Sequence, residues 1–287
     1  MNDLKSKDYA QRFEKVFVYI EQHLDESMSV EQLSRVAHFS KFHFHRQFSQ
    51  YAGTGVTAYV RLLRLKRASH RLVFGREKII HVALEAGFES PEAFARAFRQ
   101  AFGQSPSQFR TSPQWQPRNE RIRPPHRERN KNMEVQVIRF AETGVALLTH
   151  RGSPERVNNS AMTFIEWRKA SGLSPVKTSR TFGIAYDDPD TTEPEKFRFN
   201  ICGEVSAPIP DNPQGVTNGV IPGGRCAVVR HLGSHDRIAG SIYPLYREWL
   251  PQSGEELRDF PLYFHYLNLI SDAAEHELIT DIYLPLK

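Results

Sequence analysis

The sequence has little of what a secreted, metal-binding or membrane protein needs. It contains two cysteines in 287 residues, Cys202 and Cys226, and neither stands in a metal-ligand spacing. No apolar run approaches the roughly 18–20 residues of a membrane span, and residues 1–15 lack the apolar core of a signal peptide. G-x-S-x-G, P-loop and G-x-G-x-x-G motifs are also missing. We therefore expect a reduced, cytoplasmic protein with no metal, no cofactor and no membrane partner.

Charge is distributed unevenly along the chain. Residues 1–112 contain 17 Lys and Arg against 11 Asp and Glu, a net charge of +6. Residues 113–132 contain six against two (+4), and residues 133–287 contain 15 against 20 (−5). A basic front part suits a polyanionic partner, although a solvated basic surface is the commoner origin of such an excess. The proline-containing basic segment 113–132 predicts an exposed linker between domains 1–112 and 133–287.

The first domain contains an internal repeat. Each copy predicts a short helix, a turn and a second, capped helix, which is the anatomy of a helix-turn-helix motif. His38 and Gly87 stand at the same position of the two turns, where we expect a left-handed backbone. Residues 58–74 predict one longer helix that links the copies. Five residues recur at an offset of 50, namely Phe44, Arg46, Phe48, Gln50 and Gly53 as Phe94, Arg96, Phe98, Gln100 and Gly103.

The second helix of each copy carries the candidate DNA-binding residues, because the N-terminal end of such a helix meets base edges in the major groove. Arg46 and Arg96 can each bond a guanine twice, His45 can bond a base edge, and Glu92 can accept from a cytosine amino group. Either arginine alone could be a salt-bridge partner, but their recurrence at one repeated position favours DNA. The predicted contacts are Ser40, Lys41, Phe42, His45 and Arg46 in the first copy, and Ser90, Pro91, Glu92, Ala93 and Arg96 in the second.

Two further sets of residues in this domain are expected to serve other roles. The first set lies at i, i+4 on one helix face and is expected in the core, namely Phe44, Phe48, Phe94 and Phe98. The second set lies on the linking helix and predicts a solvated face with some phosphate contact, namely Arg64, Arg67 and Arg71.

Residues 133–287 change to short runs rich in Val, Ile, Leu, Tyr and Phe, which predict strands. Helical segments interrupt them at 158–170 and 239–250. This part repeats as well, at an offset of 81, with His150 recurring as His231 and Ser160 as Ser241. The predicted fold is therefore an all-α N-terminal domain with two helix-turn-helix motifs joined by a long helix, followed by an α+β domain. The α+β domain is expected to consist of two pseudo-symmetric β-α-β-β halves with helices on one side.

The segment ALEAGFESPEAFARAFRQAFGQSPSQFR, residues 83–110, closely resembles the C-terminal signature of AraC/XylS-type transcription regulators. The resemblance covers about residues 10–112 and rests on the aromatic after glycine, the Ser-Pro cap and the FG-x-SP ending. It implies a DNA-binding domain whose two recognition helices enter adjacent major-groove segments of double-stranded DNA. One chain then supplies a recognition helix for each half-site, so a monomer is able to bind DNA. RNA polymerase is a further candidate partner, and activation is favoured over repression by this resemblance alone.

The C-terminal part is similar to GyrI-like small-molecule-binding domains, from its duplicated halves and its D-x-Y-x-P ending, and the combination resembles the Rob-type arrangement. The resemblance implies a cleft between the halves for bulky hydrophobic, often cationic effectors. Phe264 stands where relatives often carry a glutamate, so a neutral or aromatic ligand is favoured unless Asp281 or Glu204 reaches it. The candidate ligand-binding residues, each individually more typical of a core, are Tyr186, Trp249, Phe264 and Tyr266.

Two alternatives remain for the C-terminal domain. Some GyrI-like domains hydrolyse reactive small molecules with a pocket Glu and Tyr, and the phenylalanine at 264 argues against that activity here. Others act as gyrase-type protein inhibitors. We expect a sequence-specific DNA-binding transcription regulator that is not an enzyme.

Overall fold

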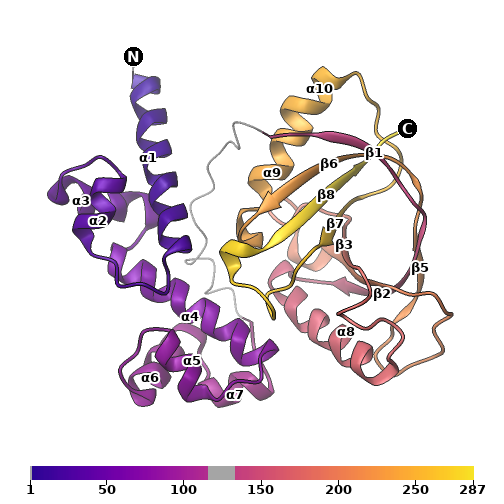
Figure 1. The fold of residues 1–287 in the computed structure, drawn as a ribbon, viewed down its shortest axis with the longest axis horizontal. Coiled ribbons are helices and arrows are strands. Elements are labelled where there is room, and N and C mark those ends of the chain that lie inside the picture. The colour runs from indigo at the N-terminus through magenta and orange to yellow at the C-terminus, as the bar shows by residue number, and fades with distance from the viewer. Residues whose placement is uncertain (1, 116–132) are drawn as a thin grey trace. The chain divides into compact units, whose positions relative to one another are not determined.

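The computed structural model describes residues 2–115 and 133–287, and describes residues 2–10 and Phe42 without their side chains. The chain separates into two compact units, one helical and one built on a β-sheet (Figure 1). None of the helices described combines the length and apolar character that crossing a membrane would demand.

The helical unit contains the predicted helix pairs and the predicted linking helix. The first helix pair is α2 and α3, the second is α5 and α6, and α4 connects them (Figure 1). The helices are α1 (Asn2–Gln22), α2 (Val30–Val36), α3 (Lys41–Ala52), α4 (Val56–Phe74), α5 (Ile79–Glu85), α6 (Pro91–Phe102) and α7 (Pro106–Thr111).

Serine side chains fix where several of these helices begin. Ser29 forms a capping box with Gln32 at the start of α2, satisfying two backbone groups that a helix end leaves without partners. The Ser40 hydroxyl accepts from the backbone N–H of His43, and the Ser90 hydroxyl accepts from that of Ala93. These bonds set the first residue of α3 and of α6, and therefore which side chains project from their N-terminal turns.

The turns of the two helix pairs share an uncommon backbone conformation. His38 has a φ of 53° and Gly87 has a φ of 77°. Within the described residues, His38 is the one non-glycine residue with a positive φ. Glycine adopts this conformation freely, and histidine adopts it more readily than most residues. The expected left-handed turn is confirmed at both positions.

Two apolar clusters, rather than one, hold the helical unit together. The first includes buried residues from Phe13 to Leu63, and the second includes buried residues from Leu65 to Trp115. The boundary between them falls inside α4. The four phenylalanines expected in the core are each 0% exposed, namely Phe44, Phe48, Phe94 and Phe98.

The second unit is one antiparallel sheet of eight strands with the order β1-β6-β8-β7-β3-β4-β2-β5. The strands are β1 (Gln136–Phe140), β2 (Thr143–Arg151), β3 (Thr181–Ala185), β4 (Arg198–Glu204), β5 (Thr217–Ile221), β6 (Gly224–Leu232), β7 (Leu262–Tyr266) and β8 (Ile279–Pro285). Short 3-10 turns lie at Pro154–Arg156, Pro194–Lys196, His235–Arg237 and Glu275–Glu277.

The helices of this unit follow β2 and β6. Helix α8 (Val157–Ser171) matches the first predicted helix. The second predicted helix is divided into α9 (Ala239–Pro244), a π-helical turn η5 (Leu245–Trp249) and α10 (Leu250–Ser253). Pro244 lies inside this segment and lacks a backbone N–H, which accounts for the change in hydrogen-bond pattern there.

Successive side chains of each strand point to opposite faces of the sheet, so the sheet has a helix-covered face and an inner face. Residues of α8 pack with β2 and β4, residues of α9 and η5 pack with β6, β7 and β8, and Phe199 belongs to both clusters. On the inner face, all eight strands contribute to one apolar cluster that includes Phe140 of β1 and Ile221 of β5. Because β1 and β5 end the strand order, the sheet must curl to bring them into one cluster, as Figure 1 shows.

Truncation of a buried residue in the second cluster of the helical unit should lower the free energy of unfolding. Phe98→Ala should lower the free energy of unfolding by about 3–5 kcal/mol, because it removes a buried ring and leaves a cavity. Leu84→Ala, at a side chain that is 55% exposed in the same unit, is the control and should cost about 0.5 kcal/mol or less. Urea denaturation followed by circular dichroism measures both, and equal effects would contradict the assignment of Phe98 to the core.

Candidate functional site

The N-terminal turns of α3 and α6 present their predicted DNA-contacting residues to solvent. Lys41, His45 and Arg46 are exposed on α3, and Pro91, Glu92 and Arg96 are exposed on α6. Ala93 is half-buried, Ser40 is exposed and Ser90 is half-buried. The side chain of Phe42 lies outside the described residues.

Arg46 and Arg96 occupy equivalent places in the two helices. Arg46 lies midway between Phe44 and Phe48, which are buried in the first cluster. Arg96 has the same relation to the two phenylalanines of the second cluster. Since two residues of an α-helix span about 200°, each arginine projects away from the face that its neighbours bury. The fold therefore presents the same cation twice, once from each helix pair.

Lys41 has a partner within the first helix pair. Its Nζ forms an ion pair with the carboxylate of Glu31, a residue of α2. Both side chains are at least half exposed, so the pair contributes little to stability. The hydrogen bond with Lys41 lowers the pKa of Glu31. Lys41 is thus paired with a carboxylate at the start of α3.

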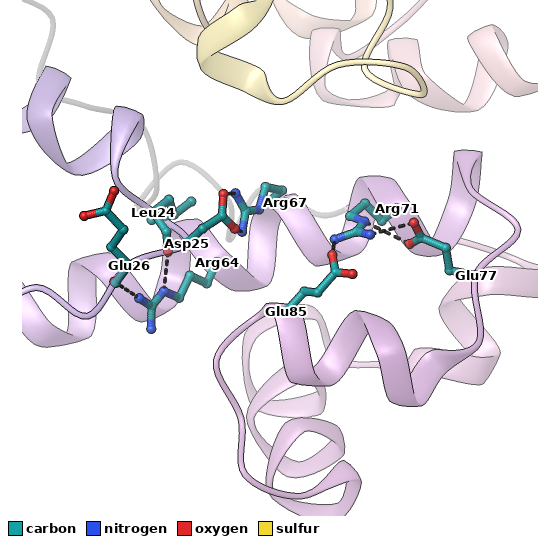
Figure 2. Close-up of polar contacts among 8 residues, drawn as sticks. All are labelled: Leu24, Asp25, Glu26, Arg64, Arg67, Arg71, Glu77 and Glu85. Atoms are coloured by element: carbon teal, nitrogen blue, oxygen red, sulfur yellow. Dashed lines mark hydrogen bonds and ion pairs between the residues drawn. The ribbon is translucent and has the colours of Figure 1, made fainter.

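Three arginines of α4, namely Arg64, Arg67 and Arg71, do not form the expected solvated face (Figure 2). Arg64 donates to the backbone carbonyl oxygens of Leu24 (2.8 Å) and Glu26 (2.7 Å), which follow the end of α1. The contacts of the other two are ion pairs, namely Arg67 with Asp25, and Arg71 with Glu77 and Glu85. The prediction of a solvated face is wrong, because all three arginines bind partners within the helical unit.

Two ion pairs lie on the inner face of the sheet. Arg180 binds Glu204 through contacts of 2.8 and 2.9 Å, and Arg230 binds Asp281 through contacts of 2.7 and 2.9 Å. His265 lies in register with Asp281 and with Phe182, on which its ring stacks. Burial, and then the positive charge of Arg180, lowers the pKa of His265. The carboxylates of Glu204 and Asp281 are thus each paired with a guanidinium.

The four predicted ligand residues are not brought together. Tyr186 follows β3 and is 41% exposed, and its hydroxyl accepts a hydrogen bond from the Asn200 side-chain amide at 3.2 Å. Trp249, Phe264 and Tyr266 instead belong to the apolar cluster under α9 and η5, on the helix-covered face. Strand alternation places Tyr186 on the other face, because it lies two residues beyond Ile184 of the inner cluster.

Sequence reasoning missed Asn200. This residue of β4 is 5% exposed, and its Oδ1 is buried without a hydrogen-bond partner. An unpaired buried acceptor is costly, so it marks a place where a ligand donor would be stabilised. No signal in the sequence points to it, because the fold decides whether an amide oxygen is left without a partner.

The repeated histidines and serines of the sheet unit have a structural role. His150 Nδ1 lies 2.8 Å from Ser160 Oγ, and His231 Nδ1 lies 2.9 Å from Ser241 Oγ. Each contact joins the end of a strand to the helix that follows it. Across the residues that the structure describes, no group of three or more His, Cys, Asp or Glu could hold a metal ion.

Comparison with protein families identifies both parts of the chain. A helix-turn-helix domain model matches residues 33–112, and the model of the GyrI-like small molecule binding domain matches residues 133–287. The chain belongs to the GyrI-like family. Its helical region is of the AraC type, so this GyrI-like protein combines the two parts of a DNA-binding regulator with a small-molecule-binding C-terminal domain.

Relatives of this GyrI-like protein match different shares of the chain. The probable transcriptional regulator YgiV of Escherichia coli K12 is 54% identical over 157 residues, which is 55% of this chain and 98% of YgiV. The uncharacterized HTH-type transcriptional regulator YbfP of Bacillus subtilis is 42% identical over 103 residues, which is 36% of this chain and 35% of YbfP. The right origin-binding protein of E. coli K12 is 34% identical over 120 residues, 42% of this chain and 41% of that protein.

The lowered pKa of His265 predicts how acid affects the GyrI-like domain. As pH falls, the unfolded chain takes up a proton at its ordinary pKa of about 6.5, before the folded chain does. The free energy of unfolding should therefore decrease as pH falls through this value, and His265→Gln should reduce the decrease. Urea denaturation at a series of pH values measures both proteins. Parallel profiles would show that His265 does not contribute.

Proposed function

We propose that residues 1–112 bind a bipartite site in double-stranded DNA, that residues 113–132 are a linker, and that residues 133–287 respond to a small-molecule effector. The observation that carries the DNA-binding part is the repeated presentation of Arg46 and Arg96 at the exposed starts of two capped helices. The names of the relatives support a role in transcription, and a DNA partner is consistent with a cytoplasmic location.

The residues proposed to contact DNA divide by role. Arg46 and Arg96 bond guanine, and His45 and Glu92 bond other base edges. Ala93 and Phe42 are proposed to meet thymine methyl groups. Lys41, Ser40 and Ser90 lie at the helix starts, where phosphates are bound, and Pro91 is placed with the base-facing residues of α6.

We further propose that one chain occupies both half-sites of the DNA. Two adjacent major-groove segments on one face of DNA lie about one helical turn, roughly 34 Å, apart. The helical unit supplies one recognition helix to each segment, so a monomer is sufficient. RNA polymerase is the proposed second macromolecular partner and activation the proposed outcome, both on the strength of the AraC/XylS resemblance.

The strand order supports two pseudo-symmetric halves in the GyrI-like domain, in which β1 or β5 precedes each predicted β-α-β-β unit. Exchanging β1 with β5, β6 with β2, β8 with β4 and β7 with β3 reverses the order onto itself. A pseudo-twofold axis between β3 and β7 is therefore proposed. The equivalent contacts His150–Ser160 and His231–Ser241 support it independently.

The effector site is proposed on the inner face, beside Tyr186 and Asn200. Glu204 and Asp281 are held by Arg180 and Arg230, so neither carboxylate is available as the main counter-charge of a cation. A neutral, aromatic ligand with one hydrogen-bond donor for Asn200 Oδ1 fits this surface better.

The remaining ligand candidates are proposed to act through packing and not through hydrolysis. Trp249, Phe264 and Tyr266 support the helix-covered face, and Phe264 stacks with Phe199 at 6.3 Å. Burial raises the pKa of Tyr266, so its hydroxyl remains protonated at neutral pH and is a poor base or nucleophile. A regulator without enzymatic activity is therefore the function we propose.

Selection of genomic DNA fragments at fixed, physiological salt tests the DNA-binding proposal. Wild-type protein should enrich one bipartite motif, and Arg46→Ala and Arg96→Ala should each relax one half of it at a cost of about 1–3 kcal/mol. Arg99→Ala, an exposed arginine in the last turn of α6, is the matched control and should leave the motif intact. Enrichment no better than that of a generic basic protein would reject the proposal.

Fluorescence titration with two dyes tests the effector site. A neutral aromatic dye such as Nile red should bind more tightly than the cationic rhodamine 6G. Tyr186→Ala should lower the affinity for the neutral dye about tenfold, which is equivalent to about 1.4 kcal/mol. Val176→Ala, at an exposed residue of the same domain, is the control. Tighter binding of the cation, or unchanged binding by Tyr186→Ala, would contradict the proposed site.

A further inference from the structure

The two helix pairs meet along α4, and their apolar clusters are separate. Leu63 packs in the first cluster and Leu65 packs in the second, so Arg64 lies at the boundary. A groove of about 530 Å³ lies between the pairs, lined by Met28 and Val30 of the first side and by Gly87 and Phe88 of the second. Arg64 also lines this groove. Arg61 lines it as well, with its guanidinium 5.4 Å from the centre of the Phe88 ring.

Arg64 reaches both sides of the groove. Its Nε and Nη2 donate to the carbonyl oxygens of Leu24 and Glu26, which fixes the turn after α1 (Figure 2). Its Nη1 points at the second side, because a Cβ built on Gly87 would lie only 2.7 Å from it. Arg67 and Arg71 differ in this respect. The ion pair of Arg67 in Figure 2 is with the first side only, and the ion pairs of Arg71 are with the second side only.

The two copies of the turn differ in a way that Arg64 explains. Both turns have positive φ, yet the first carries His38 and the second carries Gly87. A side chain is tolerated at position 38, which is exposed. At position 87 the positive φ favours glycine, and a Cβ would also meet the end of the Arg64 side chain, which would have to shift.

We propose that Arg64 is a positioning residue that sets the spacing between the two recognition helices. Its guanidinium ties the turn after α1 to the turn between α5 and α6, and so holds the starts of α3 and α6 at one separation. It acts through the fold and does not contact DNA. The inference rests on the proposed function, since it concerns how the two halves of the DNA site are read together.

Binding to sites of altered spacing tests this role. The DNA is the selected bipartite site with its half-sites in place or moved by one base pair in either direction, which shifts them by about 3.4 Å and rotates them by about 35°. Wild type should lose about tenfold or more in affinity on both altered sites, because its helices are held rigidly. Arg64→Met should bind the native spacing more weakly and lose less than about threefold on the altered sites.

The salt dependence of binding distinguishes positioning from phosphate contact. A lost phosphate contact lowers the slope of log affinity against log salt by about 1, whereas a lost positioning contact leaves it unchanged. Arg64→Met should therefore keep the wild-type slope. Arg67→Met and Arg71→Met are the matched controls and should keep the wild-type spacing preference. A reduced slope, or a wild-type spacing profile in Arg64→Met, would overturn the proposal.

A double-mutant cycle tests the contact itself. Gly53→Ala is the control, because Gly53 has a φ of 67° and open space where its Cβ would lie. The loss of affinity for the native site caused by Gly87→Ala should exceed the loss caused by Gly53→Ala about fivefold or more, and this difference is the excess. In an Arg64→Ala background this excess should disappear, because the obstructing guanidinium is gone. Persistence of the excess would overturn the proposal. Thermal unfolding confirms that each variant is folded, and Arg64→Lys provides a second substitution that keeps the charge.

Failure of this inference is distinguishable from failure of the proposed function. If wild type enriches no bipartite motif, the DNA-binding proposal is rejected and the spacing experiment has no substrate. If wild type enriches such a motif and Arg64→Met retains its spacing preference, only the role of Arg64 is rejected.

Discussion

The continuity of α4 is the constraint on which the helical unit depends. Leu63 and Leu65 are neighbours on one hydrogen-bonded helix, yet they pack into different apolar clusters. An α-helix of 19 residues is stiff, so it joins the two separately packed clusters into one unit. The serine caps then orient α3 and α6 within their own clusters. Local capping thus fixes direction, and α4 carries the Arg64 side chain that is proposed to set the spacing.

Much of this organisation follows from residues that are close in sequence. The repeat of Phe44 and Arg46 as Phe94 and Arg96 indicated the buried and exposed sides of both recognition helices, because helical periodicity is a local property. The partners of Arg64 could not be found in that way. Its acceptors lie 38 and 40 residues away, and spacing alone places a side chain on a helix face without showing what lies opposite.

The sheet unit shows the same limit in another form. Alternation along β3, β4 and β7 separates the strand residues into two sets, but does not indicate which set the helices cover. Phe264 and Tyr266 were therefore grouped with Tyr186 by residue type, whereas the fold buries those two under α9 and η5. Asn200 escaped notice because an amide in a strand carries no local signal of being unsatisfied. That property emerges only when its surroundings are in place.

The inner cluster has a chemical consequence for signalling. Cys202 and Cys226 lie among its aromatic residues, both are 0% exposed, and burial raises the pKa of each thiol. Oxidants and electrophiles react with an accessible thiolate, and these thiols are neither accessible nor ionised at neutral pH. Oxidants and electrophiles therefore find no accessible thiolate at either cysteine of this fold.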